Sequence, residues 1–335
     1  MSSTFLRRGA VLVAVAALAL AGCSDDASEG GTPSATGTPS ATGSATPTEE
    51  PTPGTYDTAA TSCTPVAAGD SKLLAATTLT GDVGTTPEIK IDPKFEVPEK
   101  GETAVACTGD GPKVAEGELV SFLARVVTIA DGTHLGLTSA PLFFPTPATT
   151  GTLDTGALAG LTVGTRIVSA FPNSGSAAAQ VFEIVDTFPA TPEVTDAKAG
   201  DAGLPTATAE KGTKPTVKLP EGGITIPRGI SRVVLEEGDG PVVEKTDTIA
   251  AHYLGVKGSD GTEFDSSWSR GDEPTEFPLS GVVSGWTHGL SGVKAGSTVM
   301  LVIPPAYGYG LNQSSELATE TMIFVVTIEK VVDAK

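Results

Sequence analysis

The sequence predicts an α+β fold that is mainly β, built from antiparallel sheets in two domains. Apolar side chains alternate with a period of two along several segments, as in Ile249, Ala251 and Tyr253, which is typical of a strand with one buried face. The chain has 335 residues, which is long enough for two domains with separate cores. The C-terminal part also repeats an earlier part, which indicates that both domains share one fold.

Tight turns separate the predicted strands of the C-terminal part. Residues 299–303 and 324–328 show the same alternation of apolar side chains. Asp260-Gly261 predicts a hairpin turn into residues 262–266, because glycine tolerates the positive φ that such turns need. Together these segments predict a mostly antiparallel sheet.

A single short helix is expected within residues 284–294. Three glycines make this segment a weak helix former. Trp286, Leu290 and Val293 nevertheless lie at helical spacing, so one face of the segment is apolar.

The repeat has an ungapped register. At an offset of 129, residues 108–114 line up with residues 237–243, and residues 131–133 line up with residues 260–262. Such self-similarity indicates two copies of one structural unit. The segment between the copies is rich in Ala, Gly, Thr, Lys and Asp without any period, which favours an exposed linker. The predicted organisation is a signal peptide (1–22), a tether (23–60), a first domain (61–195), a linker (196–214) and a second domain (215–335).

The N-terminal segment is typical of an exported protein. Arg7 and Arg8 precede an apolar run at residues 10–21, which is shorter than the about 20 residues that a membrane-spanning helix needs. The run ends in Leu-Ala-Gly-Cys, which resembles a bacterial lipobox and implies lipidation of Cys23. The alternative is an ordinary secretory signal followed by an incidental cysteine. We expect an extracytoplasmic protein, lipid-anchored to the cell membrane, because two or more acyl chains hold a protein stably.

Residues 23–60 are expected to form a disordered tether. They are rich in Ser, Thr, Pro, Gly and Ala, and one six-residue sequence occurs twice in succession. Such a composition buries too little apolar surface to fold. O-glycosylation of this stretch is a second hypothesis from the same composition.

Charge and cysteine content narrow the classes of function. The chain has 40 acidic and 21 basic residues and a net charge of −19, so we expect no nucleic-acid partner. The three histidines are isolated, and no cysteine pair has zinc spacing, so no metal or other cofactor is predicted. In an exported chain, Cys63 and Cys107 would form one disulfide. Two unpaired buried cysteines are the alternative, because spacing alone does not fix their separation.

The aromatic residues of the C-terminal part occur in a characteristic order of motifs. The motifs are His-Tyr-Leu-Gly at 252–255, Phe-Asp-Ser-Ser at 264–267, Val-Val-Ser-Gly-Trp at 282–286 and Tyr-Gly-Tyr-Gly at 307–310. This succession resembles the FKBP-type peptidyl-prolyl isomerases. The resemblance implies two FKBP-like domains, each an antiparallel sheet wrapped on a short helix. It places the proline-binding pocket on Tyr253, Phe264, Asp265, Val282, Val283, Trp286, Tyr309 and Phe324.

The implied chemistry suits these residues. Rotation about an X-Pro bond takes on the order of tens to hundreds of seconds without a catalyst, and it breaks no bond to a heavy atom. A catalyst therefore needs an apolar slot for the prolyl ring and donors for the flanking carbonyls. The resemblance implies Trp286 as the floor, and the Val283 N–H and the Tyr309 hydroxyl as donors. Asp265 would face the twisting carbonyl, or would be held by Arg270 and Tyr253.

The first copy lacks these residues. At the repeat offset, Ala124 stands where Tyr253 stands, Leu135 and Gly136 replace the Phe-Asp pair, and residues 173–176 replace the Tyr-Gly-Tyr motif. We therefore predict that the first copy is not an isomerase. A structural spacer and a client-binding module remain alternatives.

The second copy also departs from the family pattern. Thr275 stands where the family often has an aromatic wall residue, and the Ile-Pro-Pro tip is replaced by residues 315–319 within an altered 311–320 loop. Both turnover and macrolide binding are expected to be weaker as a result. Leu317 could substitute for the missing tip.

The sequence thus predicts a peptidyl-prolyl cis-trans isomerase that acts on exported proteins. Its partners would be proline-containing peptides, unfolded exported proteins and, through the lipid, the membrane. We expect a monomer. The alternative is a non-enzymatic extracytoplasmic chaperone or peptide-binding lipoprotein on the same scaffold, and a structural cell-envelope protein is a third hypothesis.

Overall fold

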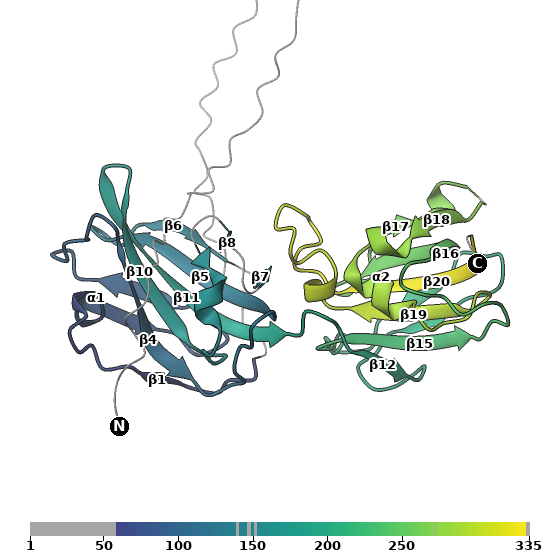
Figure 1. Cartoon of the computed structure of the whole chain (residues 1–335), viewed down its shortest axis with the longest axis horizontal. Coiled ribbons are helices and arrows are strands. Elements are labelled where there is room, and N and C mark those ends of the chain that lie inside the picture. Colours follow the sequence, from purple (N-terminus) through teal and green to yellow (C-terminus); the bar gives the residue numbers. More distant parts are fainter. Residues whose placement is uncertain (1–57, 139–140, 146–148, 151–152, 272, 333–335) are drawn as a thin grey trace, which may run out of the picture.

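The computed structural model describes residues 58–332 apart from residues 139–140, 146–148, 151–152 and 272. The predicted signal peptide, the lipidation site Cys23 and nearly all of the predicted tether lie outside the described residues. Figure 1 shows two halves side by side along the long axis, each built around one twisted sheet. Among the described residues, no helix is both long enough and apolar enough to cross a membrane.

The N-terminal half contains a seven-stranded sheet. Its strands are β1 (Cys63–Pro65), β4 (Glu102–Gly109), β5 (Leu119–Thr128), β6 (His134–Leu137), β7 (Leu142–Pro145), β10 (Arg166–Asn173) and β11 (Ser176–Phe188). Their order is β1-β4-β10-β11-β5-β6, and β7 pairs with β5 beside β6. Two further strand pairs are β2 (Thr77–Thr80) with β3 (Glu88–Ile91) and β8 (Thr149–Thr150) with β9 (Leu153–Asp154).

The C-terminal half contains a second seven-stranded sheet with the corresponding order. Its strands are β12 (Val194–Ala197), β15 (Ile230–Glu236), β16 (Thr248–Lys257), β17 (Glu263–Ser266), β18 (Thr275–Pro278), β19 (Thr298–Ile303) and β20 (Met322–Val331). Their order is β12-β15-β19-β20-β16-β17, and β18 pairs with β16. All neighbours are antiparallel except β12 and β15, which are parallel.

Strands of the two sheets lie at the spacing of the sequence repeat. Strands β5 and β16 have the same length and lie 129 residues apart, as do β6 and β17. Each half also contains one isolated antiparallel bridge, which joins Lys113 to Thr162 in the first half and Val242 to Lys294 in the second. The bridged residues correspond to one another, so the halves agree even in irregular segments.

The segment predicted as a linker, residues 196–214, contains strands. Strand β12 enters the second sheet at its edge, and β13 (Thr206–Thr208) forms a hairpin with β14 (Thr216–Lys218). Ala197, Leu204 and Ala207 pack against the second sheet. The hairpin corresponds to the β2–β3 hairpin of the first half, so the second structural unit begins near β12 and not at residue 215.

Each sheet is covered on both faces. In the second half, the β13–β14 hairpin covers one face, and α2 (Ser284–Gly289) lies over the other, where Trp286 and Leu290 belong to the main core. In the first half, α1 (Lys72–Ala76) and the β2–β3 hairpin cover one face. The other described short helices are 3-10 helices: η1 (Thr155–Leu158), η2 (Ser267–Ser269), η3 (Leu279–Gly281) and η4 (Pro305–Tyr307).

In the part of the chain that the structure describes, an α-helix lies at the position of α2 only in the second half. Among the described residues of the first half, the 3-10 helix η1 lies close to the sequence position that corresponds to α2. Leu158 at its end is buried in the core, as Leu290 is in the second half. One apolar residue anchors this segment where the second half uses a helical turn.

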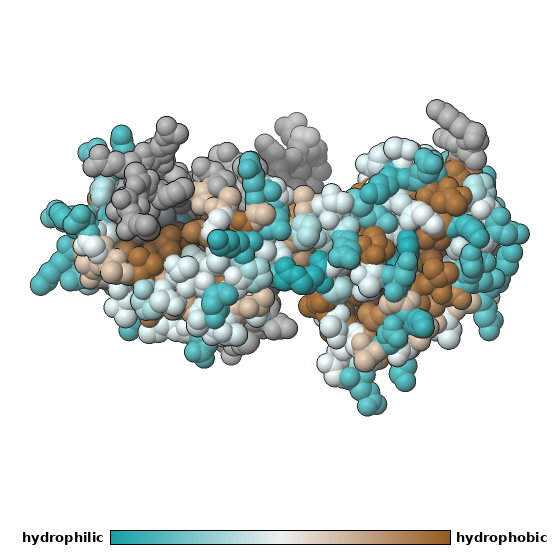
Figure 2. All heavy atoms as spheres, turned by 60° about the horizontal axis from the view of Figure 1, so that its bottom comes forward, coloured by the Kyte–Doolittle hydropathy of each residue, from teal (hydrophilic) through white to brown (hydrophobic). Residues whose placement is uncertain are grey.

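The disulfide between Cys63 and Cys107 is present, with a Cα–Cα distance of 5.4 Å. It joins β1 to β4 at the edge of the first sheet. Figure 2 shows hydrophilic side chains over much of the surface of both halves. Apolar patches lie among these side chains, particularly on the C-terminal half.

Candidate active site

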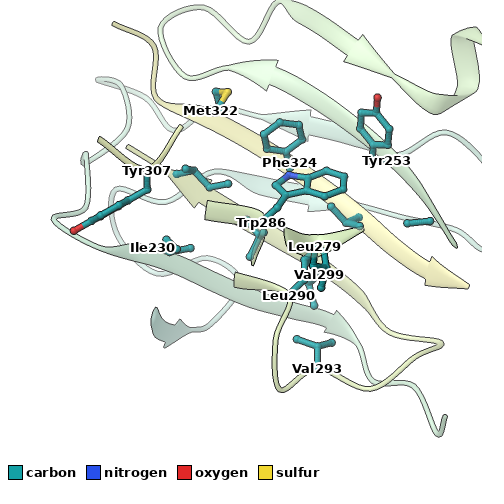
Figure 3. Packing of buried hydrophobic residues seen from close by; sticks show 14 of the residues in the cluster. Ile230, Tyr253, Leu279, Trp286, Leu290, Val293, Val299, Tyr307, Met322 and Phe324 are labelled. Carbon is teal, nitrogen blue, oxygen red and sulfur yellow. The ribbon is translucent and has the colours of Figure 1, made fainter. Parts of the chain in front are cut away.

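The site is built around Trp286 in the middle of α2. Gly285 lies directly against Ile303 of β19, where a Cβ atom would overlap the isoleucine side chain. The glycine therefore lets the helix approach the sheet closely. Trp286 is 4% exposed, and Figure 3 shows its indole beside the ring of Phe324, with Tyr253 to one side.

Three rings pack edge-on against the indole. The centroid of Trp286 lies 5.2 Å from Phe324, 5.3 Å from Tyr253 and 5.2 Å from Phe277, with interplanar angles of 83°, 87° and 70°. Phe264 extends the cluster, since its ring lies 5.4 Å from Phe324. These edge-to-face arrangements are the favourable ones for aromatic pairs. We call these five residues the ring cluster.

Strand geometry brings the rings together over Gly255. Tyr253 and Gly255 point to the same face of β16, and Gly255 pairs directly with Phe324 on β20. A Cβ atom at Gly255 would lie 2.7 Å from the Phe264 ring and 2.8 Å from the Phe324 ring. The glycine of the His-Tyr-Leu-Gly motif therefore leaves the space that these two rings occupy.

The floor of the ring cluster is closed. Trp286, Tyr253 and Phe324 are only 4–5% exposed, so the rings fill the space that the sequence predicted as an open slot. The rim is more accessible, because Phe264, Val282 and Val283 are half-buried. A ligand can contact the cluster at this rim.

Tyr253, Asp265 and Arg270 form a hydrogen-bonded group beside the cluster. The Tyr253 hydroxyl donates to Asp265 Oδ2 at 2.5 Å, and Arg270 Nη1 donates to Asp265 Oδ1 at 2.7 Å. Arg270 also donates to the Tyr253 hydroxyl, and its guanidinium lies 5.4 Å from the centre of the tyrosine ring. The predicted contact of Asp265 with Arg270 and Tyr253 is therefore confirmed.

This group shifts the titration of its members. Burial would raise the pKa of Asp265, but hydrogen bonds from Tyr253 and Arg270 outweigh it and lower that pKa below its usual value. Burial, together with the hydrogen bond to Asp265, raises the pKa of Tyr253 to about 12. At neutral pH the carboxylate is therefore charged and the phenol keeps its proton.

Two donors near the rings have no acceptor among the described residues. The indole Nε1 of Trp286 is buried and unpartnered. The backbone N–H of Val283, the residue that precedes α2, also has no recorded acceptor within the described part of the chain. Buried polar groups are nearly always paired in folded proteins, so unpaired donors beside an apolar cluster are suited to a ligand carbonyl.

Tyr309 lies on the connection between β19 and β20, outside the ring cluster. Its side chain is 38% exposed, and no ring contact or hydroxyl hydrogen bond is recorded for it within the described residues. Leu317 on the same connection packs against the main core. The structure thus brings together every predicted site residue except Tyr309.

Phe277 is the site residue that the sequence analysis missed. It contacts both Trp286 and Tyr253, and it lies on the same strand as Thr275, the position at which an aromatic wall was expected. Both residues lie on β18, two positions apart, and so on one face of the strand. The period-two pattern could have indicated Phe277 as the wall. The other tryptophan, Trp268, lies outside the cluster and stacks on His252 at 4.5 Å.

The corresponding place in the first sheet is polar. Ala124 pairs with Phe182 as Tyr253 pairs with Val326, so Gln180 occupies the position of Phe324. The Gln180 side chain is fully buried, and neither amide atom has a hydrogen-bond partner within the described residues. The ring cluster therefore has no counterpart there.

In the described part of the chain, no group of three or more His, Cys, Asp or Glu residues lies so that it could hold a metal ion.

Comparison with known proteins gives consistent similarities. The family model described as FKBP-type peptidyl-prolyl cis-trans isomerase matches residues 240–329. A probable FK506-binding protein of Corynebacterium glutamicum is 36% identical over 116 residues, which cover 34% of this chain and 96% of the relative. An FK506-binding protein of Streptomyces anulatus is 41% identical over 117 residues, which cover 33% of this chain and 92% of the relative.

A longer relative is matched over only part of its length. The FKBP-type peptidyl-prolyl cis-trans isomerase FkpA of Escherichia coli is 45% identical over 82 residues, covering 24% of this chain and 30% of the relative. The crystal structure of FkpA superimposes with a TM-score of 0.30 at 37% identity, covering 33% of this chain and 52% of the other.

Proposed function

Because the chain belongs to the FKBP-type peptidyl-prolyl cis-trans isomerases, we propose that the ring cluster of its C-terminal half binds the prolyl ring during isomerisation. The enzyme acts on X-Pro bonds, as the family does. The proposal rests most directly on the packing of four aromatic rings around or beside Trp286. Beside them, the indole N–H of Trp286 and the backbone N–H of Val283 have no acceptor among the described residues.

The reaction requires the X-Pro amide to twist out of its plane. Resonance is lost as it twists, and the barrier falls if the twisted amide is bound more tightly than the planar one. An apolar surface that excludes water also removes hydrogen bonds that stabilise the planar carbonyl. Neither a nucleophile nor a proton transfer is needed.

The prolyl ring would contact the cluster over its half-buried rim, beside Phe264 and Val282. Packing against Phe264 and Phe324 would fix the ring while the preceding carbonyl rotates. The Val283 N–H would bind a client carbonyl, since it has no acceptor among the residues that the structure describes. Tyr309 would donate its hydroxyl to the other flanking carbonyl, because its exposed side chain is free of hydrogen bonds within the described structure.

Asp265 would place a fixed negative charge beside the carbonyl of the client. Its carboxylate is held by Tyr253 and Arg270, so it cannot turn freely toward the client. A fixed negative charge beside the twisting carbonyl favours rotation of that carbonyl away from it. The same hydrogen bonds keep the Tyr253 ring in place as one wall of the cluster.

The N-terminal half would be a second FKBP-like unit without isomerase activity. It has the strand order of the C-terminal half, but Ala124 and Gln180 occupy the places of two essential rings. The tight turn at Ser174 and Gly175, with φ values of 39° and 87°, stands where the C-terminal half has the connection that bears Tyr309. Activity would therefore be confined to the C-terminal half.

The clients would be exported proteins met outside the cytoplasm. The apolar run before Cys23 and the tether composition support export and lipid anchoring, and the disulfide supports an oxidising compartment. A tether would hold the folded halves away from the membrane, where newly exported chains pass. Incorporation of radiolabelled palmitate, abolished by Cys23→Ala, tests this part of the proposal.

The central proposal is tested by comparing the two tryptophans in the full chain. Trp286→Ala should lower kcat/KM for a proline-containing peptide by about 100-fold or more, since it removes the floor of the cluster. Trp268→Ala, which removes the other tryptophan, should change kcat/KM by about twofold at most. Equal losses in both variants would contradict the assigned role of the ring cluster. Peptide binding without any rate above background would favour the alternative, a non-enzymatic chaperone.

A further inference from the structure

Tyr307, the first tyrosine of the Tyr-Gly-Tyr-Gly motif, points away from the ring cluster (Figure 3). Its side chain is 1% exposed, and its hydroxyl donates to the backbone carbonyl of Pro189 at 2.9 Å. Pro189 directly follows β11, the last strand of the N-terminal sheet. The motif that carries Tyr309 is thus bonded to the other half of the molecule.

Aromatic packing strengthens this junction. The ring of Phe188 meets Tyr307 edge-on at 6.3 Å, and Phe143 of β7 lies 5.7 Å from Phe188. Phe143 and Phe188 are each 7% exposed. Both belong to the same continuous apolar core as Trp286, so the core of the catalytic half extends into the N-terminal sheet.

Arg228 fixes the same junction from the C-terminal half. Its guanidinium lies 5.7 Å from the centre of the Phe188 ring and 2.6 Å from Asp186. It also donates to the carbonyl of Thr187. The end of β11 is therefore held against the catalytic half by an ion pair, a backbone hydrogen bond and ring contacts together.

The segment that the junction holds is the one that bears Tyr309. The N–H groups of Gly308 and Gly310 both donate to the carbonyl of Pro305, at 3.0 and 2.8 Å. A Cβ atom at Gly310 would lie 2.9 Å from the Phe143 ring, so the backbone passes directly over it. Tyr309 therefore lies between two residues, Tyr307 and Gly310, that contact the N-terminal half.

We propose that the N-terminal sheet is a positioning element for catalysis, which holds residues 307–310 so that the Tyr309 hydroxyl meets the client carbonyl. Phe188 and Tyr307 are the positioning residues. An exposed donor loses conformational freedom when it binds, and fixing its neighbours beforehand reduces this cost. The inference rests on the proposed role of Tyr309. It assigns the non-catalytic half a purpose that neither a spacer nor a client-binding module would have.

Two substitutions in the full chain loosen the junction to different degrees. Phe188→Leu removes the ring contacts but keeps an apolar side chain, and Tyr307→Phe removes only the hydroxyl. Phe122→Leu is the matched control, because Phe122 is a ring of the same sheet that is 1% exposed and belongs to a separate core. All three variants should retain the native circular dichroism spectrum.

Hydrogen exchange measures the junction independently of activity. In Phe188→Leu, the amides of Gly308 and Gly310 should exchange about tenfold faster than in the parent chain, because their segment opens more often. kcat/KM should fall by about threefold to tenfold, and the loss caused by Tyr309→Phe should be smaller in this background than in the parent. Tyr307→Phe should give smaller changes of the same kind. Phe122→Leu should leave exchange at these amides and kcat/KM unchanged.

The outcomes separate this inference from the proposed function. An active parent chain with unchanged exchange in Phe188→Leu overturns the inference alone. Faster exchange with unchanged kcat/KM, or additive effects of Phe188→Leu and Tyr309→Phe, also overturns it, because the contact would then be structural only. A parent chain without isomerase activity overturns the proposed function, and the inference with it.

Discussion

Replacing Tyr253 with phenylalanine tests whether the hydroxyl, and not only the ring, contributes to the site. The substitution leaves the three ring contacts of Tyr253 in place and removes the hydrogen bond to Asp265 at 2.5 Å. It also removes the acceptor of one Arg270 hydrogen bond. Asp265 would keep its second bond to Arg270 but would turn more freely.

The expected magnitude follows from the exposure of the partners. A hydrogen bond to a charged group contributes about 1.5–3 kcal/mol when buried. The side chains of Asp265 and Arg270 are 43% and 48% exposed, so solvent screens part of this contribution. We expect the free energy of unfolding to fall by about 1 kcal/mol. If the same geometry is needed in the transition state, kcat/KM should fall by about fivefold to tenfold.

The assay is isomerisation of a proline-containing peptide, followed by NMR exchange between its cis and trans signals. Urea unfolding of the same variants gives the change in stability. A double variant that also carries Asp265→Ala should lose less activity than the two single losses added together, since both changes act on one hydrogen bond. A Tyr253→Phe variant with normal kcat/KM, or fully additive losses, would refute the assignment of Asp265 as a fixed charge.

Three further predictions concern pH, the disulfide and a glycine. The pKa of Asp265 is lowered on folding, so its contribution to stability is complete above the unfolded value of about 3.9 and is lost as pH falls through the folded pKa. Asp265→Asn should therefore flatten the pH dependence of the free energy of unfolding in urea below about pH 4, and an unchanged slope would contradict this. Replacing Cys63 and Cys107 with serine opens a loop of 44 residues and should cost about 4 kcal/mol by the chain-entropy relation, measured as a lower urea midpoint for the N-terminal half. Gly255→Ala should lower kcat/KM and the melting temperature together, because the new methyl group meets two rings; Ala251→Gly on the same strand is the control, which should affect the melting temperature only.

Much of the fold could be predicted from the sequence because the repeat has a strict register. The offset of 129 residues correctly pairs β5 with β16 and β6 with β17, and the alternation at Ile249, Ala251 and Tyr253 correctly assigns their buried face. The strands within residues 196–214 could not be predicted from composition. Most side chains of the segment are exposed or only partly buried, and its strands β12 and β13 pair with β15 and β14, which local composition does not reveal.

The sequence identified the residues of the site, but it did not predict the shape of the site. Motif order identified Trp286, Tyr253 and Phe324, but the closure of the floor depends on how the rings pack, with centroids 5.2–6.3 Å apart. The junction at Phe188 and Tyr307 could not be predicted either. It joins residues more than a hundred positions apart, and neither motif alone indicates a partner.

The parallel pairing of β12 with β15 affects how this chain can be divided. Residues 189–193 connect the two sheets, and β12 then covers the outer edge of the second sheet along Ile230 to Val233. A fragment that starts at residue 215 would leave the backbone donors and acceptors of that edge unpaired, and exposed edges of this kind favour aggregation. Such a fragment could lose solubility without any damage to its aromatic residues. A cut before residue 189 would preserve the edge but would discard the ring of Phe188.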